Sequence, residues 1–388
     1  MDAGSHVEPE TTATRTYRVY SRIMAPLVDS RRKAGAMLWV TAGLFGVSLL
    51  LIVVGAVPLK MLPFDNKNEL QLVVDMPETA TLEQTDAVVR EVEQYLRTVP
   101  EVTSFLSTVG ASSPMDFNGL VRHYYLRQGP QVADVRLQLL PKDERAMNSH
   151  ALALRLRGDI EALGERLGAS IKIVESPPGP PVLSTVVAEV YGEPHHTYAE
   201  LVAAAEGVAA AMREEPGVVD VDTTVEQNPR KLFFRTDREK AALNGIATDD
   251  IVQTLRMALG GGPAGLLHVA AEHNETPIVV RLPREARSDA ARLLTLPIKG
   301  RSGQVVQLGE LGAFEQDVQD QTVFHKNQER VVFVTAEMAG RGPAYAVLNL
   351  QKHFAQHPLP AGIRIDWKGE GEWKITVDVF RDLGIAFA

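Results

Sequence analysis

Residues 34–57 read AGAMLWVTAGLFGVSLLLIVVGAV and contain no charged residue. A helix rises 1.5 Å per residue, so a run of this length crosses a hydrocarbon core of about 30 Å. Arg31, Arg32 and Lys33 stand immediately before the run, whereas a weaker and mixed set of charges follows it. Because positive residues favour the cytosolic side, we expect a transmembrane helix with the long C-terminal part outside the cytosol.

A secretory signal peptide is the competing interpretation of this run. The apolar stretch is longer than a usual signal-peptide core, and residues 57–60, VPLK, make a poor cleavage site. The sequence therefore favours a membrane anchor.

The arm before the span, residues 1–33, is expected to lie in the cytosol. Between residues 16 and 29, apolar side chains recur every three or four positions and arginines occupy other faces. This spacing predicts a short amphipathic helix on the inner surface of the lipid bilayer. A helix packed on a soluble partner is the alternative that the sequence leaves open.

Composition narrows the class of protein. The 388 residues carry a formal net charge of −9, with a pI near 5.6 and no basic stripe, which argues against a nucleic-acid partner. Cysteine is absent, so disulfides, thiolate metal sites and cysteine nucleophiles are excluded. Since the sequence contains no phosphate loop and no nucleophile elbow, we expect no enzyme activity, no catalytic residues and no cofactor.

Beyond the span, strand-like and helix-like patterns alternate in residues 66–176. The patterns predict strands at 70–76, 102–109, 132–140 and 171–174, helices at 81–98 and 146–167, and an irregular segment at 110–131. This β-α-β-β-α-β order is typical of a ferredoxin-like unit, in which two helices cover one face of a four-stranded sheet.

A proline-rich stretch at residues 177–181 ends this first unit, because it cannot continue a helix or a central strand. A second unit follows, split into residues 184–229 and 326–370 around an inserted α/β module at 230–325, in which Thr248 is expected to cap a helix. Residues 377–388 turn apolar and indicate the start of a truncated second span. The predicted fold class is α+β: one transmembrane helix, then two ferredoxin-like units, the second interrupted by the insert.

Several short motifs lie in this order along the chain. The most specific are EPGVVDVD at residues 215–222 and REKAALNGI at 238–246 followed by TDDI at 248–251; MLPFD at 61–65 and PETAT at 77–81 support them. Together they resemble the second half of a resistance–nodulation–division (RND) efflux permease, from about residue 16 to the end of the chain.

The resemblance implies a proton-driven antiporter in the cell inner membrane, multi-pass in its full length and homotrimeric. The two ferredoxin-like units would be porter subdomains in the periplasm, and the insert would dock toward an outer-membrane channel. A periplasmic adaptor (membrane fusion) protein would complete the assembly. The proton-carrying residues of this family belong to other spans, and residues 34–57 contain no ionisable group.

By position, the irregular segment 110–131 resembles the loop that separates two substrate pockets in this family. Gly110 would be its hinge, and the end of a strand would face the same cleft. The expected substrate-binding residues are Phe105, Gly110, Met115, Phe117, Leu120, Val174, Glu175 and Pro178. For each aromatic residue taken singly, an ordinary place in the core is the alternative. Aromatic and flexible apolar side chains suit small amphiphilic substrates, so the sequence favours multidrug export.

Export of heavy metals is the main alternative within the family. Metal-transporting members place a methionine before a Leu-Ser-Thr triplet, where this chain has Val182 before residues 183–185. His195 and His196, like His268 and His273, lack an acidic partner at ligand spacing in the sequence, so we expect no metal site. Outside this family, a single-pass anchored binding or sensor module and an anchored hydrolase remain as alternatives.

Overall fold

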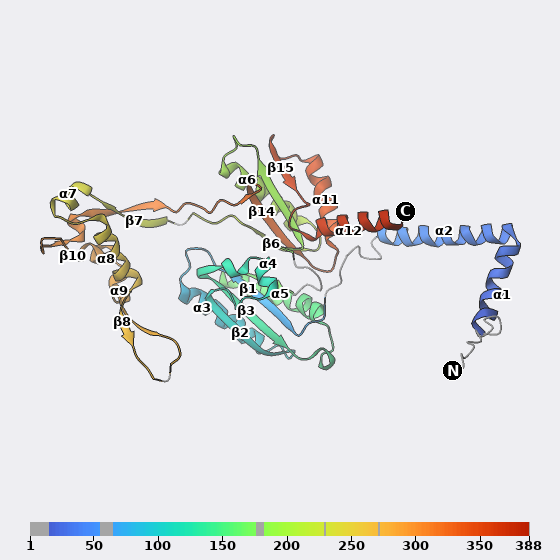
Figure 1. Cartoon of the computed structure of the whole chain (residues 1–388), viewed down its shortest axis with the longest axis horizontal. Coiled ribbons are helices and arrows are strands. Elements are labelled where there is room, and N and C mark those ends of the chain that lie inside the picture. Colours follow the sequence, from blue (N-terminus) through green and yellow to red (C-terminus); the bar gives the residue numbers. More distant parts are fainter. Residues whose placement is uncertain (1–14, 55–64, 176–181, 229, 271, 388) are drawn as a thin grey trace, which may run out of the picture. The chain divides into compact units, whose positions relative to one another are not determined.

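A computed structural model describes residues 15–54, 65–175, 182–228, 230–270 and 272–387. The chain divides into two compact units, residues 1–225 with 323–388, and residues 226–322. The first unit contains two sheet-and-helix modules, here called the first module (residues 69–174) and the second module (residues 186–223 with 325–366) (Figure 1).

Two helices precede the modules: α1, Arg15–Asp29, and α2, Arg31–Val53. Among the described residues, α2 is the helix that is long and apolar enough to cross a membrane, over Arg31–Leu51. The predicted apolar helix is therefore confirmed, although residues 55–57 of the predicted span lie outside the described residues. α1 has apolar and basic faces, and its tyrosine, valine and isoleucine side chains are exposed.

The first module is a four-stranded antiparallel sheet in the order β2-β3-β1-β4. Its strands are β1 (Glu69–Asp75), β2 (Val102–Ala111), β3 (Gln128–Leu139) and β4 (Ser170–Val174). The helices α3 (Leu82–Leu96) and α5 (Ser149–Leu167) follow β1 and β3. One core joins both helices to the sheet through alternate strand residues such as Leu70, Leu72 and Val74. The opposite face of this sheet therefore carries Glu69, Gln71 and the other intervening side chains.

The prediction of an irregular segment at 110–131 is partly wrong. Asp116 accepts a hydrogen bond from the Gly119 N–H at 2.6 Å and so caps the short helix α4, Phe117–Val121. A 3-10 turn follows at Tyr124–Leu126, and β3 already begins at Gln128. A five-residue helix leaves too short an apolar period to be recognised in the sequence.

The second module repeats the same order of strands, β6-β14-β5-β15, with β13 beside the start of β14. The strands are β5 (Val186–Gly192), β6 (Val218–Thr223), β13 (His325–Lys326), β14 (Glu329–Met338) and β15 (Ile363–Asp366). α6 (Tyr198–Glu214) and α11 (Pro343–Gln356) pack on it through one core. Because β6 pairs with β14, the segments before and after residues 226–322 complete one sheet.

Residues 226–322 form their own unit around a small core that includes Ile251, Ile298 and Leu308. Its helices are α7 (Arg238–Leu243), α8 (Thr248–Gly260), α9 (Arg284–Arg287) and α10 (Ala290–Leu294). Its strands are β7 (Arg230–Thr236), β8 (Gly262–Leu267), β9 (Thr276–Val280), β10 (Pro297–Lys299), β11 (Val305–Gln307) and β12 (Gly312–Val318).

The sequence pattern does not predict β8 and β12, which pair with β9 and β7. Thr248 was expected to cap α8, but it is the first helical residue. Ala247 is the cap residue, and its N–H donates to the Asp250 carboxylate at 2.9 Å.

The described chain ends in α12, Glu372–Phe387. This helix begins earlier than the apolar stretch at 377–388 and carries Lys374, Asp378, Arg381 and Asp382. That the stretch opens a second span therefore stays a prediction.

Candidate functional site

The open face of the first sheet carries rows of side chains that are neighbours across strands. In one row, Arg136 of β3 lies between Leu106 of β2 and Gln71 of β1. In the next, Gln138 lies between Ser104 and Glu69. Successive strand residues point to opposite faces, so the same alternation that buries the leucines of this sheet turns polar groups outward.

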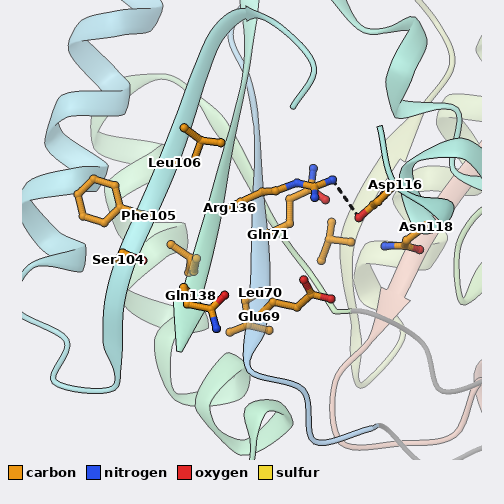
Figure 2. Close-up of a pocket in the computed structure, with 12 residues that line it drawn as sticks. Glu69, Leu70, Gln71, Ser104, Phe105, Leu106, Asp116, Asn118, Arg136 and Gln138 are labelled. Carbon is orange, nitrogen blue, oxygen red and sulfur yellow. Dashed lines mark ion pairs between the residues drawn. The ribbon is translucent and has the colours of Figure 1, made fainter. Parts of the chain in front are cut away.

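A cavity of about 350 Å³ lies over these rows (Figure 2). It is lined by Glu69, Leu70, Gln71, Ser104, Phe105, Leu106, Asp116, Asn118, Arg136, Leu137, Gln138 and Val174. The polar part of the lining consists of carboxylates, side-chain amides, a hydroxyl and one guanidinium. Histidine and methionine are absent from it.

Arg136 ties the segment that follows β2 to this face of the sheet. Its guanidinium lies 2.9 Å from a carboxylate oxygen of Asp116, an ion pair that Figure 2 shows across the cavity. It also donates to the Ser113 hydroxyl at 3.0 Å and to the Pro114 carbonyl at 2.9 Å. One side chain of β3 thereby fixes the position of Asp116 in the lining.

A second charged group lies farther along the same face. The carboxylate of Asp134 is fully buried, accepts from the Ser113 N–H at 2.8 Å and pairs with Arg127. Arg127 also pairs with Asp75 at 2.5 Å, and Lys172 lies 3.0 Å from Asp75. Burial acts to raise the pKa of Asp75, but attraction to Lys172 and Arg127 outweighs it and holds the pKa below its usual value.

Ion pairs join the two modules, and in each described pair the first module supplies the cation. Lys172 pairs with Asp222 of β6, and Arg157 of α5 lies 2.8 Å from Asp220 of the same strand. Asp220 sits at a bulge of β6 with a φ of 53°, and its burial raises its pKa. The two strands β4 and β6 are thus held together by charges of opposite sign.

The third pair joins the segment after β2 to the second module. Arg122, at the end of α4, lies 2.6 Å from Glu337 of β14, and the side chains are 7% and 18% exposed. Ser184 donates to the same carboxylate at 3.0 Å, and Thr185 donates to its other oxygen. The helix that carries Asp116 and Asn118 at its start is therefore anchored to the second module at its end.

The structure separates the predicted site residues into groups. Phe105 and Val174 line the cavity, but Met115, Phe117 and Leu120 are 66%, 69% and 45% exposed and do not.

The other three predicted residues lie elsewhere. Gly110 has a φ of 84°, a backbone conformation that favours glycine, and a Cβ there would also press on Leu82 Cδ1 at 2.7 Å. Glu175 pairs with His150 at 2.9 Å, and Pro178 lies outside the described residues.

Sequence reasoning missed the polar lining. Glu69, Gln71, Arg136 and Gln138 alternate with apolar residues along β1 and β3, and this alternation is the signal in the sequence that points to them. An amphiphilic substrate needs apolar contacts, so the expectation of such a substrate does not point to these polar residues.

A carboxylate oxygen of Glu193 lies 3.5 Å from the Nδ1 of His195, and both side chains are exposed. Even so, the described residues contain no group of three or more His, Cys, Asp or Glu side chains arranged to hold a metal ion.

The sequence matches the AcrB/AcrD/AcrF family over residues 4–376. The chain belongs to this family of RND permeases. It is 26% identical over 352 residues to the nickel and cobalt resistance protein CnrA of Cupriavidus metallidurans, covering 87% of this chain and 31% of CnrA. It is 25% identical to the nickel-cobalt-cadmium resistance protein NccA of Alcaligenes xylosoxydans xylosoxydans, covering 89% of this chain and 32% of NccA.

The fold agrees with the crystal structure of a heavy metal efflux pump at a TM-score of 0.70 and 20% identity, covering 95% of this chain and 37% of the pump. The chain thus spans about a third of the length of the curated relatives it matches. Because these relatives are named for metal resistance, the expectation of a multidrug exporter of amphiphiles is wrong. Val182 in place of a methionine argues only against a thioether relay of the kind that suits copper(I), and nickel and cobalt also accept nitrogen and oxygen ligands.

Proposed function

We propose that this chain is the cargo-binding part of an inner-membrane exporter of divalent metal ions. The observation that carries the proposal is the cavity on the first module, where Glu69 and Asp116 stand among amide oxygens. The resistance to nickel and cobalt for which CnrA is named supports the same class of cargo.

The chemistry of the lining suits a cation that keeps part of its water shell. Carboxylate and amide oxygens bind hard and borderline divalent ions, and the soft thioethers that select copper(I) are absent from the lining. Arg136 offsets one of the two negative charges, so an arriving ion competes with it for Asp116. Binding of this kind is weak enough for the cargo to leave again, as transport requires.

Around the cavity, we propose that the segment 112–127 acts as a gate. Gly110 would be its hinge, Phe105 and Val174 the apolar floor, and Met115, Phe117 and Leu120 the outer surface of the gate. The ion pairs of Arg136 with Asp116 and of Arg122 with Glu337 support this proposal, because they hold the segment against the two modules near its two ends.

At the level of domains, we propose that the two modules are ferredoxin-like porter subdomains in the periplasm. The strand orders β2-β3-β1-β4 and β6-β14-β5-β15 support this assignment. Residues 226–322 would be the docking subdomain, α2 the membrane anchor and α1 a helix on the inner surface. Membership of the RND family supports a homotrimer driven by proton antiport, with an adaptor protein and an outer-membrane channel as partners.

The test is metal resistance conferred by the full-length permease in a metal-sensitive host. Asp116→Asn removes one charge of the lining and should lower resistance to nickel, cobalt, zinc or cadmium toward that of an empty vector. Asp143→Asn is the matched control, since Asp143 is an exposed carboxylate outside the cavity. Export of metal from loaded cells, compared at equal amounts of membrane protein, separates loss of transport from loss of the protein.

Unchanged metal export in Asp116→Asn would overturn the assignment of the cavity. Wild-type protein that raises resistance to none of these metals would overturn the proposed substrate class.

A further inference from the structure

Two exposed histidines lie four residues apart at the C-terminal end of α11. His353 is in the last turn of the helix, and His357 is the cap residue that follows it, with its N–H still bonded to the His353 carbonyl. Their rings are stacked, with centroids 4.7 Å apart and planes 30° from parallel. Two imidazoles therefore meet on one solvent-facing surface of the second module.

The orientation of the His357 ring is fixed by the backbone. Its Nδ1 lies 3.2 Å from the His353 carbonyl oxygen, which can only accept, so Nδ1 carries the hydrogen. In the neutral ring the lone pair is then on Nε2. Histidines that bind metal commonly donate their other N–H to a carbonyl in this way, which sets the ring before the ion arrives.

The His353 ring is held by its neighbour in the helix. It packs edge-on against Phe354, with centroids 5.0 Å apart, and Phe354 in turn packs against the module core and the Trp367 ring. These contacts keep the His353 side chain beside His357 on the surface of the module.

The other histidine pair near this end of the module lacks these properties. His195 and His196 are adjacent in sequence, and the His196 Nε2 lies 3.1 Å from the Ala361 carbonyl. The remaining ring nitrogen of His196 is buried without a hydrogen-bond partner, so it is closed to an ion from solvent. The α11 pair is thus the better placed of the two.

We infer that His353 and His357 together bind a divalent transition-metal ion from solvent. Imidazole suits Ni²⁺, Zn²⁺ and Cu²⁺, and histidines at this spacing on one helix bind a shared zinc ion in other proteins. No third His, Cys, Asp or Glu ligand is arranged around a common point among the described residues. The site is therefore a two-ligand chelate, with water in the other positions. This inference is independent of the proposed transport function.

The test uses the whole chain, purified in detergent without a polyhistidine tag, and Ni²⁺ as the probe. Equilibrium dialysis should find a bound ion in the wild type whose affinity falls about tenfold or more in His353→Gln and in His357→Gln, since each removes one of the two ligands. His325→Gln is the matched control, because His325 is also exposed and its Nδ1 also lies 3.2 Å from a backbone carbonyl.

A second pair of variants tests the helical geometry and not only the number of histidines. Ala355→His with His357→Ala keeps two exposed histidines but places them two residues apart, on different faces, and should bind as weakly as His357→Ala. Gln356→His with His357→Ala restores a three-residue spacing on one face and should recover binding in part. Equal Ni²⁺ affinity in wild type, His353→Gln and His357→Gln would overturn the inference, as would full affinity in the Ala355→His variant.

Discussion

Arg122 and Glu337 form an ion pair between side chains that are mostly buried. The carboxylate also accepts hydrogen bonds from Ser184 and Thr185, so its oxygens are satisfied in the folded chain. Burying two charges costs desolvation energy, and the pair offsets this cost only while both partners are present. The loss of one partner is therefore more damaging than the loss of an exposed pair.

We predict that Glu337→Ala lowers the free energy of unfolding by about 3–5 kcal/mol, because it leaves Arg122 buried without a counter-charge. Denaturant titration of the detergent-solubilised chain, followed by tryptophan fluorescence, measures this change. Glu329→Ala is the control, since the pair of Glu329 with Arg364 is 52% and 55% exposed. Its loss should cost less than about 1 kcal/mol. Similar costs for the two variants would contradict the prediction.

The same carboxylate gives the stability a defined pH dependence. Burial acts to raise the pKa of Glu337, but attraction to Arg122 and the hydrogen bonds from Thr185 and Ser184 outweigh it, so the pKa lies below its ordinary value of 4.5. A lowered carboxyl pKa contributes stability that is complete above 4.5 and is lost as the pH falls through the folded-state pKa.

Below pH 4.5, wild-type stability should therefore fall more steeply than that of Glu337→Gln. Thermal unfolding from about pH 7 to about pH 3 measures the two curves. Parallel curves would show that Glu337 does not titrate with folding.

At the scale of elements, α3 is an example of a helix whose first turn is capped by residues adjacent to it in the sequence. The Thr81 side chain accepts from the Gln84 N–H, and the Gln84 side chain accepts from the Thr81 N–H at 2.8 Å. This reciprocal arrangement satisfies two backbone donors that a helix start otherwise leaves open. A helix capped by Thr81 is what the sequence predicts, and this cap is confirmed, with Leu82 as the first helical residue.

Replacing the Thr81 cap should lower the stability of the chain only modestly, because one hydrogen bond at the start of α3 is lost. We predict that Thr81→Ala lowers the free energy of unfolding by about 1 kcal/mol, because the Gln84 N–H loses its acceptor. Thr79→Ala, an exposed change in the preceding turn, should have little effect and serves as the control. Denaturant midpoints that are equal for the two variants would show that the cap is not needed.

The sequence does not predict elements whose positions depend on contacts with residues far away along the chain. The segment 112–127 is positioned by Arg136 from a neighbouring strand and by Glu337, 215 residues from Arg122 along the chain. Neither contact produces a repeating pattern of apolar residues in the sequence of the segment itself, so the sequence alone does not predict it. The half-buried strand at 132–140 was predicted from its alternation, yet nothing local shows that its polar face lines a cavity. Of the residues that line the cavity, the sequence predicts Phe105 and Val174 but not the two carboxylates, Glu69 and Asp116.

At the scale of the whole molecule, residues 226–322 interrupt a sheet without disturbing it. β7 and β12 pair, and the Gln321 side chain donates to the Glu226 carbonyl at 2.7 Å, so the two ends of this unit meet. A unit whose ends are adjacent adds little loop-closure entropy to the sheet that it interrupts. The β6–β14 pairing can therefore form as if its strands were joined by a short loop.

The position of α2 makes a prediction about the sides of the membrane. Arg31, Arg32 and Lys33 should hold residues before α2 in the cytosol, with the modules on the opposite side. Because the chain contains no cysteine, Thr79→Cys and Asp29→Cys each introduce a single thiol at an exposed position. In intact spheroplasts that express the chain, a membrane-impermeant maleimide should label Thr79→Cys at once. It should label Asp29→Cys only after the membrane is permeabilised. The reverse labelling pattern would place both modules in the cytosol. Modules on that side of the membrane could not serve export into the periplasm.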